Sequence, residues 1–202
     1  MTMEALEAIL TRRSTRKFRA EMPGRELIDR IIEAGRHAPS GGNNQTTHFI
    51  VITNPAKLAE LAMIVREEFA KMDIYPGMYR SKQNAINAAK KGTLLFHYNA
   101  PVLIVVANRT DYSNAMADSA CALENMMIAA NALDMGSCWV NQLHWLDGNE
   151  VIMKYLGALG LEEDETITGG LVLGFADTGA EGGGLPVRTA LPRTGNPVTW
   201  VE

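Results

Sequence analysis

The sequence predicts a soluble globular protein that mixes amphipathic helices with buried strands. Apolar residues recur at helical spacing in several separate segments, which is the pattern of helices with one buried face. Residues 101–106 are apolar on both faces, as is typical of a central strand. The chain has 202 residues, of which 47% are hydrophobic and 21% charged, an ordinary composition for a soluble protein. Its length alone does not separate one large domain from two closely joined ones.

In the first half of the chain, predicted helices alternate with polar loops. A short amphipathic helix should end at Arg12, and a second one should follow Pro23-Gly24 and end near Gly35. The polar residues 38–45 predict a loop. After it we expect a buried strand over 49–52, an amphipathic helix over 58–69 and a polar helix over 81–91.

The second half begins with the predicted central strand, 101–106. A long helix over 113–135 lacks a polar face and should be buried on several sides, partly by a partner subunit. Further strands are predicted over 138–140 and 167–175, with a helix ending at Gly160 between them. Residues 197–201 are alternating and apolar, which is unusual for a free tail, so we expect this segment to dock.

Charge and composition limit the possible partners. The net charge of −4 argues against a nucleic-acid binder, for which a basic domain is expected. Neither a signal peptide nor a membrane span is predicted, which favours a cytoplasmic protein that does not bind membranes. Cys121 and Cys138 are expected to be reduced thiols in the core.

The segment Arg12–Phe18 gathers four cationic side chains and two hydroxyls within six of its residues. If the chain is extended here, Arg12, Ser14 and Arg16 project from one face and span about 13 Å. Guanidinium groups suit a phosphate because their planar fork donates two parallel hydrogen bonds. The segment therefore favours a small phosphorylated ligand, and the alternative is a solvated basic turn.

The loop Pro39–Gln45 is the second candidate binding segment. Its glycines allow a backbone to approach a ligand closely. Ser40, Asn43 and Gln45 add donors and acceptors that suit a polar, uncharged group such as a ribityl chain or a pyrimidine edge. Taken alone, the loop is equally consistent with a simple polar turn.

Together these segments resemble the flavin-dependent nitroreductase family. The resemblance spans nearly the whole chain and depends on the order and spacing of several motifs. These are Arg12-Arg13-Ser14-x-Arg16-x-Phe18, Ala38-Pro39-Ser40-x-x-Asn43-x-Gln45, Gly136-Ser137-Cys138-Trp139, Gly170-Leu171-Val172-Leu173-Gly174 and Leu191-Pro192-Arg193. Two positions depart from the family pattern: Thr46 stands where proline is common, and Gly195 where a second basic residue is common. Arg188 is a candidate to compensate for the latter.

The resemblance implies an α+β, nitroreductase-like fold as a single domain over 1–202, with a central mixed β-sheet flanked by helices. It further implies an intertwined homodimer that exchanges its C-terminal strand and binds two FMN molecules at the subunit interface. The first subunit would contribute phosphate-side and ring-side groups, and the partner would contribute the loop. The implied FMN-binding residues are Arg12, Arg13, Ser14, Arg16, Val140, Asn141, Gln142 and Arg193, with Pro39, Ser40, Gly41, Asn43 and Gln45 on the loop.

The function implied is an oxidoreductase that uses NAD(P)H to reduce nitroaromatics, quinones or similar small electrophiles by a ping-pong mechanism. A flavin performs this chemistry itself, so no catalytic side chains are expected. The four histidines lack metal-ligand spacing, and no metal is expected. The alternatives are a flavin-binding sensor or storage protein without turnover, a generic phosphate binder, and a deiodinase or enone reductase of the same family.

Overall fold

The computed structural model describes residues 3–179 and 189–202, so the Gly182–Gly184 segment and Arg188 lie outside the described residues. Every helix and strand predicted above is present, with ends shifted by a few residues. In addition, two short 3-10 helices were not predicted. The elements are α1 (Ala5–Thr11), α2 (Arg25–Arg36), η1 (Gly41–Asn43), β1 (His48–Ile52), α3 (Pro55–Ala70), α4 (Arg80–Lys90), β2 (Val102–Arg109), α5 (Ala115–Ala132), β3 (Gly136–Val140), η2 (His144–Leu146), α6 (Glu150–Gly157) and β4 (Glu165–Gly174).

The four strands form one sheet in the order β1-β2-β4-β3. All three strand pairs are antiparallel, so the expectation of a mixed sheet is wrong for these four strands. The reason lies in the connections. Ile52, the last residue of β1, pairs with Leu103 at the start of β2, so the segment 53–101 leaves and re-enters the sheet at the same end. Residues 141–164 join β3 to β4 in the same way, because Val140 pairs with Gly170.

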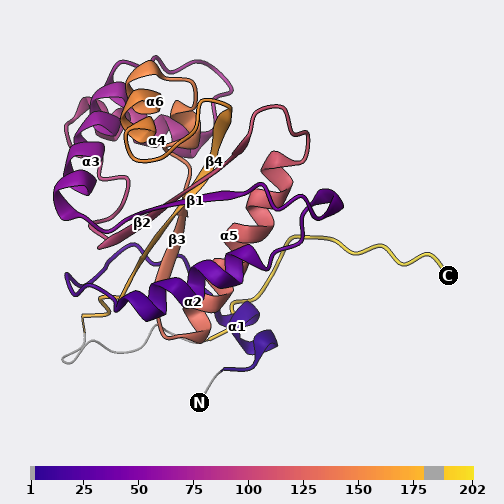
Figure 1. Cartoon of the computed structure of the whole chain (residues 1–202). Coiled ribbons are helices and arrows are strands. Elements are labelled where there is room, and N and C mark those ends of the chain that lie inside the picture. The colour runs from indigo at the N-terminus through magenta and orange to yellow at the C-terminus, as the bar shows by residue number, and fades with distance from the viewer. Residues whose placement is uncertain (1–2, 180–188) are drawn as a thin grey trace.

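Helices cover both faces of the sheet (Figure 1). Alternate residues of β2 face opposite ways, as the two-residue period of a strand requires. Leu103, Val105 and Ala107 belong to the core beneath α3, α4 and α6. Val102, Ile104 and Val106 belong to a second core beneath α2 and α5. The sheet is thus buried on both sides, which explains why residues 102–107 are apolar without alternation.

Helix α5 is buried on one side only within this chain. Leu123, Met126 and Ala130 are fully buried or nearly so, whereas Met116 is 44% exposed. Cys121 is also exposed, so the expectation that both cysteines lie in the core is wrong for Cys121, which sits on the outward face of α5. Cys138 is buried, and both thiols are free.

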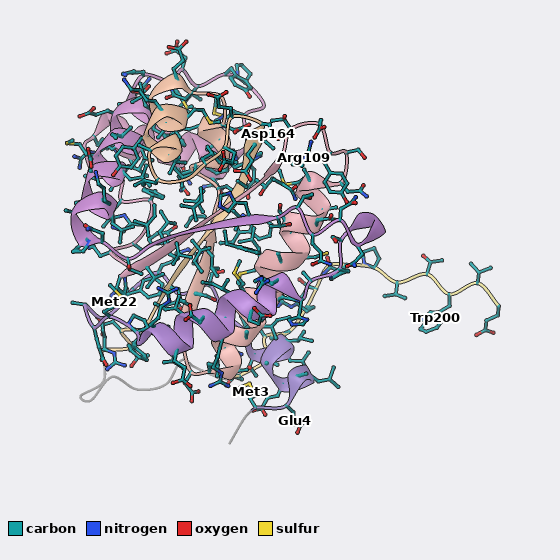
Figure 2. All side chains as sticks on the ribbon, viewed as in Figure 1. Met3, Glu4, Met22, Arg109, Asp164 and Trp200 are labelled. Carbon is teal, nitrogen blue, oxygen red and sulfur yellow. The ribbon has the colours of Figure 1, made fainter. Side chains whose placement is uncertain are left out.

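The C-terminal segment 189–202 extends away from the rest of the chain (Figure 1). Figure 2 shows Trp200 projecting from this tail, and 84% of its surface is exposed. Val198 and Val201 are also largely exposed. Within the described residues, therefore, this apolar segment does not pack against the rest of the chain.

Candidate functional site

The cationic segment runs beside β3. The chain leaves α1 at Arg12 in an extended conformation, and the backbone N–H of Thr15 donates to the carbonyl oxygen of Ser137 over 2.8 Å. Ser14 and Ser137 form an isolated parallel bridge. The outer edge of β3 is therefore occupied by the segment that carries Arg12, Ser14 and Arg16.

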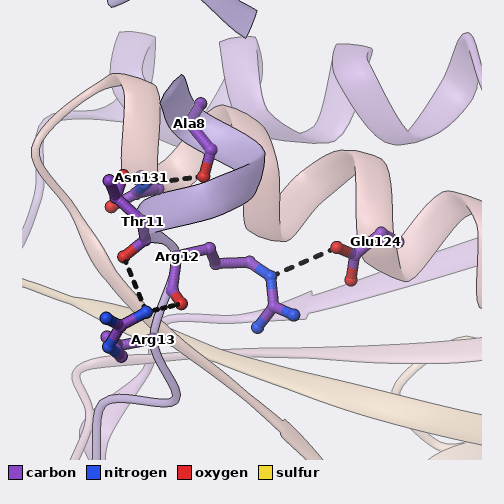
Figure 3. A network of polar contacts seen from close by, with 6 residues as sticks. All are labelled: Ala8, Thr11, Arg12, Arg13, Glu124 and Asn131. Atoms are coloured by element: carbon purple, nitrogen blue, oxygen red, sulfur yellow. Dashed lines mark hydrogen bonds and ion pairs between the residues drawn. The ribbon is translucent and has the colours of Figure 1, made fainter. Parts of the chain in front are cut away.

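Arg12 and Arg13 have different surroundings (Figure 3). Arg12 Nε donates to Glu124 Oε1 over 3.2 Å, and its two Nη groups have no hydrogen-bond partner within 3–179 and 189–202. Arg13 Nη1 donates to the carbonyl oxygens of Arg12 and Thr11 at the end of α1. Arg12 thus keeps two donors for a ligand, while Arg13 caps its own helix with one nitrogen and holds a buried, unpartnered Nη2.

Ser14 and Arg16 lie close to Cys138 on the neighbouring strand. Burial raises the pKa of the Cys138 thiol, and Arg16, a hydrogen bond with Ser14, and Arg12 partly oppose this rise. Because burial has the larger effect on its pKa, Cys138 stays a neutral thiol near neutral pH. It serves as a packing residue beneath the cationic segment.

The end of β3 leads directly into the segment expected to face a flavin ring. Val140 is buried, and Asn141 Oδ1 accepts a hydrogen bond from Trp139 Nε1 over 2.6 Å, so that the Asn141 amide N–H groups have no partner in the part of the chain that the structure describes. The Oε1 atom of Gln142 is buried without a hydrogen-bond partner among the described residues. A buried acceptor of this kind is costly unless a ligand or water satisfies it.

The loop 39–45 lies elsewhere, between the end of α2 and the start of α5. Gly41 N–H donates to both carboxylate oxygens of Asp118, over 3.2 and 3.1 Å. A cavity of about 380 Å³ opens beside the loop. Its lining includes Pro39, Ser40, Asn43 and Gln45, together with Arg36 and His37 at the end of α2.

Two groups of predicted site residues are therefore separated in one chain. Asn131 Nδ2 donates to Ala8 O and Thr11 Oγ1, which fixes the start of the cationic segment to the last turn of α5. Asp118 holds the loop at the first turn of the same helix. Thirteen residues of helix correspond to about 20 Å along the axis and a rotation that leaves the two anchors roughly 140° apart. The structure joins the segment that carries Arg12, Ser14 and Arg16 to β3 near the start of that strand, and holds the loop apart from it.

Arg193 lies in the exposed tail, and no hydrogen bond or ion pair joins it to another described residue. Three aromatic side chains pack together around η2. Trp145 in η2 packs edge-on against Phe69 and Tyr79, with ring centroids 6.3 and 6.1 Å apart. Phe69 is fully buried and is a core residue, whereas Tyr79 is 66% exposed.

Sequence reasoning missed the polar residues that hold these segments in place. Asp118, Glu124 and Asn131 all lie on α5, and the sequence showed only that charges are rare on this apolar helix. The few polar residues of this helix could have been singled out on that ground, because polar groups in a buried helix need hydrogen-bond partners. Tyr112, which contacts Asp118 and Gly41, carried no such signal.

Two broader features concern the described part of the chain as a whole. No helix there is long and apolar enough to cross a membrane. The same residues contain no group of three or more His, Cys, Asp or Glu side chains placed to hold a metal ion.

The nitroreductase family model matches residues 9–175, so the chain belongs to the nitroreductase family. A Bacteroides fragilis nitroreductase crystallised with bound FMN is 34% identical and superposes with a TM-score of 0.81, over 98% of this chain and 100% of that one. A second FMN-bound nitroreductase, from Desulfitobacterium hafniense, is 27% identical with a TM-score of 0.78, and both chains are fully covered. A Haemophilus influenzae protein provisionally assigned as an NAD(P)H nitroreductase is 26% identical over 89% of this chain and 92% of its own length.

Proposed function

We propose that this protein is an FMN-dependent oxidoreductase that uses NAD(P)H to reduce nitroaromatics, quinones or similar small electrophiles. The observation that carries the proposal is the Thr15–Ser137 hydrogen bond, which joins the cationic segment to the edge strand β3 near its start. This contact puts phosphate-binding side chains and the Asn141–Gln142 segment on one edge of the sheet. The FMN bound in the Bacteroides fragilis and Desulfitobacterium hafniense relatives supports the same cofactor here.

The groups left free by the protein's own hydrogen bonds suit FMN. Arg12 has two Nη donors for the phosphate that no described residue engages, and the Asn141 amide and the Gln142 Oε1 atom add a donor and an acceptor. On the loop, Gln45 N–H donates to Ser40 Oγ, and Gln45 Nε2 donates to Asn43 Oδ1. This leaves the Ser40 hydroxyl and the Asn43 amide as donors, and Gln45 Oε1 as an acceptor. A flavin pyrimidine edge offers two carbonyl acceptors around one N–H donor, which complements this set.

When bound, FMN supplies the hydride and electron transfer, and the protein supplies binding and electrostatics. Arg16 is expected to lie toward the ring, where its charge would favour the negative charge that reduction places on the pyrimidine end. Residues 141–145 would border the ring, and the hydrogen bond from Trp145 N–H to the carbonyl oxygen of Asn141 orders this turn. We expect NAD(P)H and the electron acceptor to use the same open face in turn.

The site is proposed to form between two subunits. The separation of the loop from Arg12 around α5 favours a loop supplied by the partner. The outward face of α5, with exposed Met116 and Cys121, and the uncovered tail favour an obligate homodimer that exchanges its C-terminal strands.

The absorbance spectrum of the purified protein tests the cofactor. A flavin spectrum is expected, and denaturation should release FMN and not FAD, which chromatography of the released flavin distinguishes. Release of FAD, or failure to take up FMN on reconstitution, would refute the proposal.

Turnover is tested separately, because a sensor or storage protein would bind the same flavin. The FMN-loaded protein should oxidise NADH or NADPH steadily when a quinone or nitroarene is added. Double-reciprocal plots at several acceptor concentrations should be parallel, as a ping-pong mechanism requires. A loaded protein that is not re-oxidised by any of these acceptors would favour a binding role without turnover.

A further inference from the structure

The loop expected to contact the flavin has a strained backbone. Gly42, Asn43 and Gln45 all have positive φ, at 60°, 56° and 53°. Glycine and asparagine adopt this left-handed conformation readily, but a glutamine seldom does, so Gln45 in particular keeps it only because its surroundings enforce it. Something outside the loop must therefore hold it.

The loop's internal hydrogen bonds close it but do not attach it to the rest of the protein. Asn43 N–H donates to the carbonyl oxygen of Ser40, and Gln45 N–H donates to the Ser40 hydroxyl. Gln45 Nε2 donates to Asn43 Oδ1. These hydrogen bonds fix the shape of the loop. Its position relative to the rest of the protein depends on other contacts.

That attachment comes from Asp118. This residue is 7% exposed, and its carboxylate accepts from the Gly41 N–H through both oxygens. The Tyr112 hydroxyl donates to Asp118 Oδ2 over 2.7 Å and lies 3.1 Å from the carbonyl oxygen of Gly41. The carboxylate also sits in the first turn of α5, where the helix dipole favours negative charge.

A side chain at position 41 would force the neighbouring side chains to shift. A Cβ atom there would lie 2.6 Å from the Tyr112 hydroxyl and 2.3 Å from Asn114 Nδ2. The Gly41 peptide is thus enclosed by Asp118, Tyr112 and Asn114. These three side chains hold the Gly41 peptide in place.

We propose that Asp118 is a positioning residue for the flavin: its carboxylate, oriented by Tyr112, holds loop 39–45 in the strained shape that presents Ser40, Asn43 and Gln45. The proposal rests on the proposed function, since it assigns the loop to FMN. Asp118 reaches the lining of the cavity beside the loop, but the hydrogen bonds of its carboxylate go to Gly41 and Tyr112. It acts through the Gly41 peptide.

Asp118→Asn is the main variant, because it keeps the shape and removes the charge. One of the two oxygens that accept from Gly41 N–H is replaced by an amide NH2 group, which donates and does not accept. The attachment of the loop to α5 is therefore weakened. Dissociation constants for FMN and for riboflavin, followed by flavin fluorescence, should both rise by about ten- to a hundredfold, the range for one hydrogen bond to a charged group. The rise should be equal for the two ligands, because the loop faces the part of the flavin that they share.

Asp111→Asn is the matched control. Asp111 is exposed and pairs with Arg109, seven residues before Asp118. This variant should bind FMN as the wild type does.

A double-mutant cycle separates positioning from general destabilisation. If Asp118 acts through the loop, Asn43→Ala should weaken FMN binding in the wild type but have little further effect in Asp118→Asn. Arg12→Ala should keep its full effect in both backgrounds, because it contacts a different part of the ligand. Full additivity of Asn43→Ala with Asp118→Asn would overturn the proposal.

Hydrogen exchange in the flavin-free protein gives an independent readout. Exchange at residues 39–45 should be faster in Asp118→Asn than in the wild type, with the strands unchanged. If Asp118→Asn does not fold, Tyr112→Phe replaces it, with a smaller effect in the same direction. FMN binding within threefold of wild type in a folded variant, with unchanged exchange, would refute the role of Asp118, whereas a wild-type protein that takes up no flavin would refute the proposed function instead.

Discussion

Arg12 reaches Glu124 with one edge of its guanidinium, through Nε, and leaves its two Nη groups without a hydrogen-bond partner among the described residues. Glu124 therefore fixes the direction of the arginine while leaving the fork that suits a phosphate.

Replacing Arg12 by alanine should weaken FMN binding by about 1.5–3 kcal/mol, the value of a hydrogen bond to a charged group. Arg193→Ala should have a similar effect if the tail returns to the phosphate. Riboflavin, which lacks the phosphate, should bind the wild type and Arg12→Ala equally weakly. Arg25→Ala, which removes an exposed arginine from α2, is the control. If Arg12→Ala weakened riboflavin as much as FMN, Arg12 would not be a phosphate ligand.

Gly136 at the start of β3 should not tolerate a side chain. A Cβ atom there would lie 2.8–3.0 Å from the side-chain atoms of Thr15, whose N–H donates to Ser137. Gly136→Ala should lower the free energy of unfolding by about 1–3 kcal/mol through overpacking, and should also weaken FMN binding because the cationic segment is displaced. Chemical denaturation and flavin titration measure the two effects. Gly157→Ala is the control, since nothing lies within 4 Å of the added atom; equal behaviour of the two variants would contradict the prediction.

The Glu68 carboxylate should make the free energy of unfolding depend on pH. Lys71 and Asn149 donate to it, and these hydrogen bonds lower the pKa of Glu68. A carboxyl whose pKa is lowered by folding stabilises the protein above its unfolded pKa, and this contribution disappears as the pH falls through the folded pKa. Between about pH 6 and about pH 3, the wild type should therefore lose more stability than Glu68→Gln.

The same contact orients Asn149, the N-cap of α6, whose Oδ1 accepts from Val151 N–H and Ile152 N–H. Glu68→Gln should thus also cost about 1 kcal/mol near neutral pH. Denaturant unfolding across the pH series measures both effects. Glu67→Gln, on the exposed side of α3, is the control. An identical pH profile for wild type and Glu68→Gln would show that Glu68 does not contribute.

The C-terminal tail is predicted to hold the dimer together. The outer edge of β3 is already occupied by residues 14–15, whereas β1 pairs with β2 alone among the described strands. We therefore expect the tail of one subunit to add a strand to the partner's β1 edge. An obligate interface of this kind buries about 2,000 Å² or more.

Deleting residues 196–202 should yield monomers with little bound flavin, as measured by mass in solution and by flavin content. FMN should in turn stabilise the full-length dimer by linkage. A chain lacking only Glu202 is the control. A truncated protein that stayed dimeric and kept its FMN would show that the tail has no such role.

Much of this structure follows from local patterns in the sequence. The helices α2 and α3 and the strand β2 were predictable because each buries a regular set of apolar residues. The direction of the strands was not, because it depends on where the segments 53–101 and 141–164 return to the sheet. Motif resemblance indicated Arg12 and the loop 39–45, but the contacts that hold them to Glu124 and Asp118 join residues more than seventy positions apart. No local pattern reports such contacts.

The way these two segments return to the sheet bears on how such a protein can change during evolution. Each segment joins two strands that are neighbours in the sheet. Residues can therefore be inserted or lost within it without shifting the pairing of those strands. Phe69 and Tyr79 come from the first segment and Trp145 from the second. Phe69 is held in the core, but the exposed Tyr79 is free to diverge, while Arg12 and the loop 39–45 are fixed to α5. We expect relatives to differ most in the small molecules they accept and least in how they hold the cofactor.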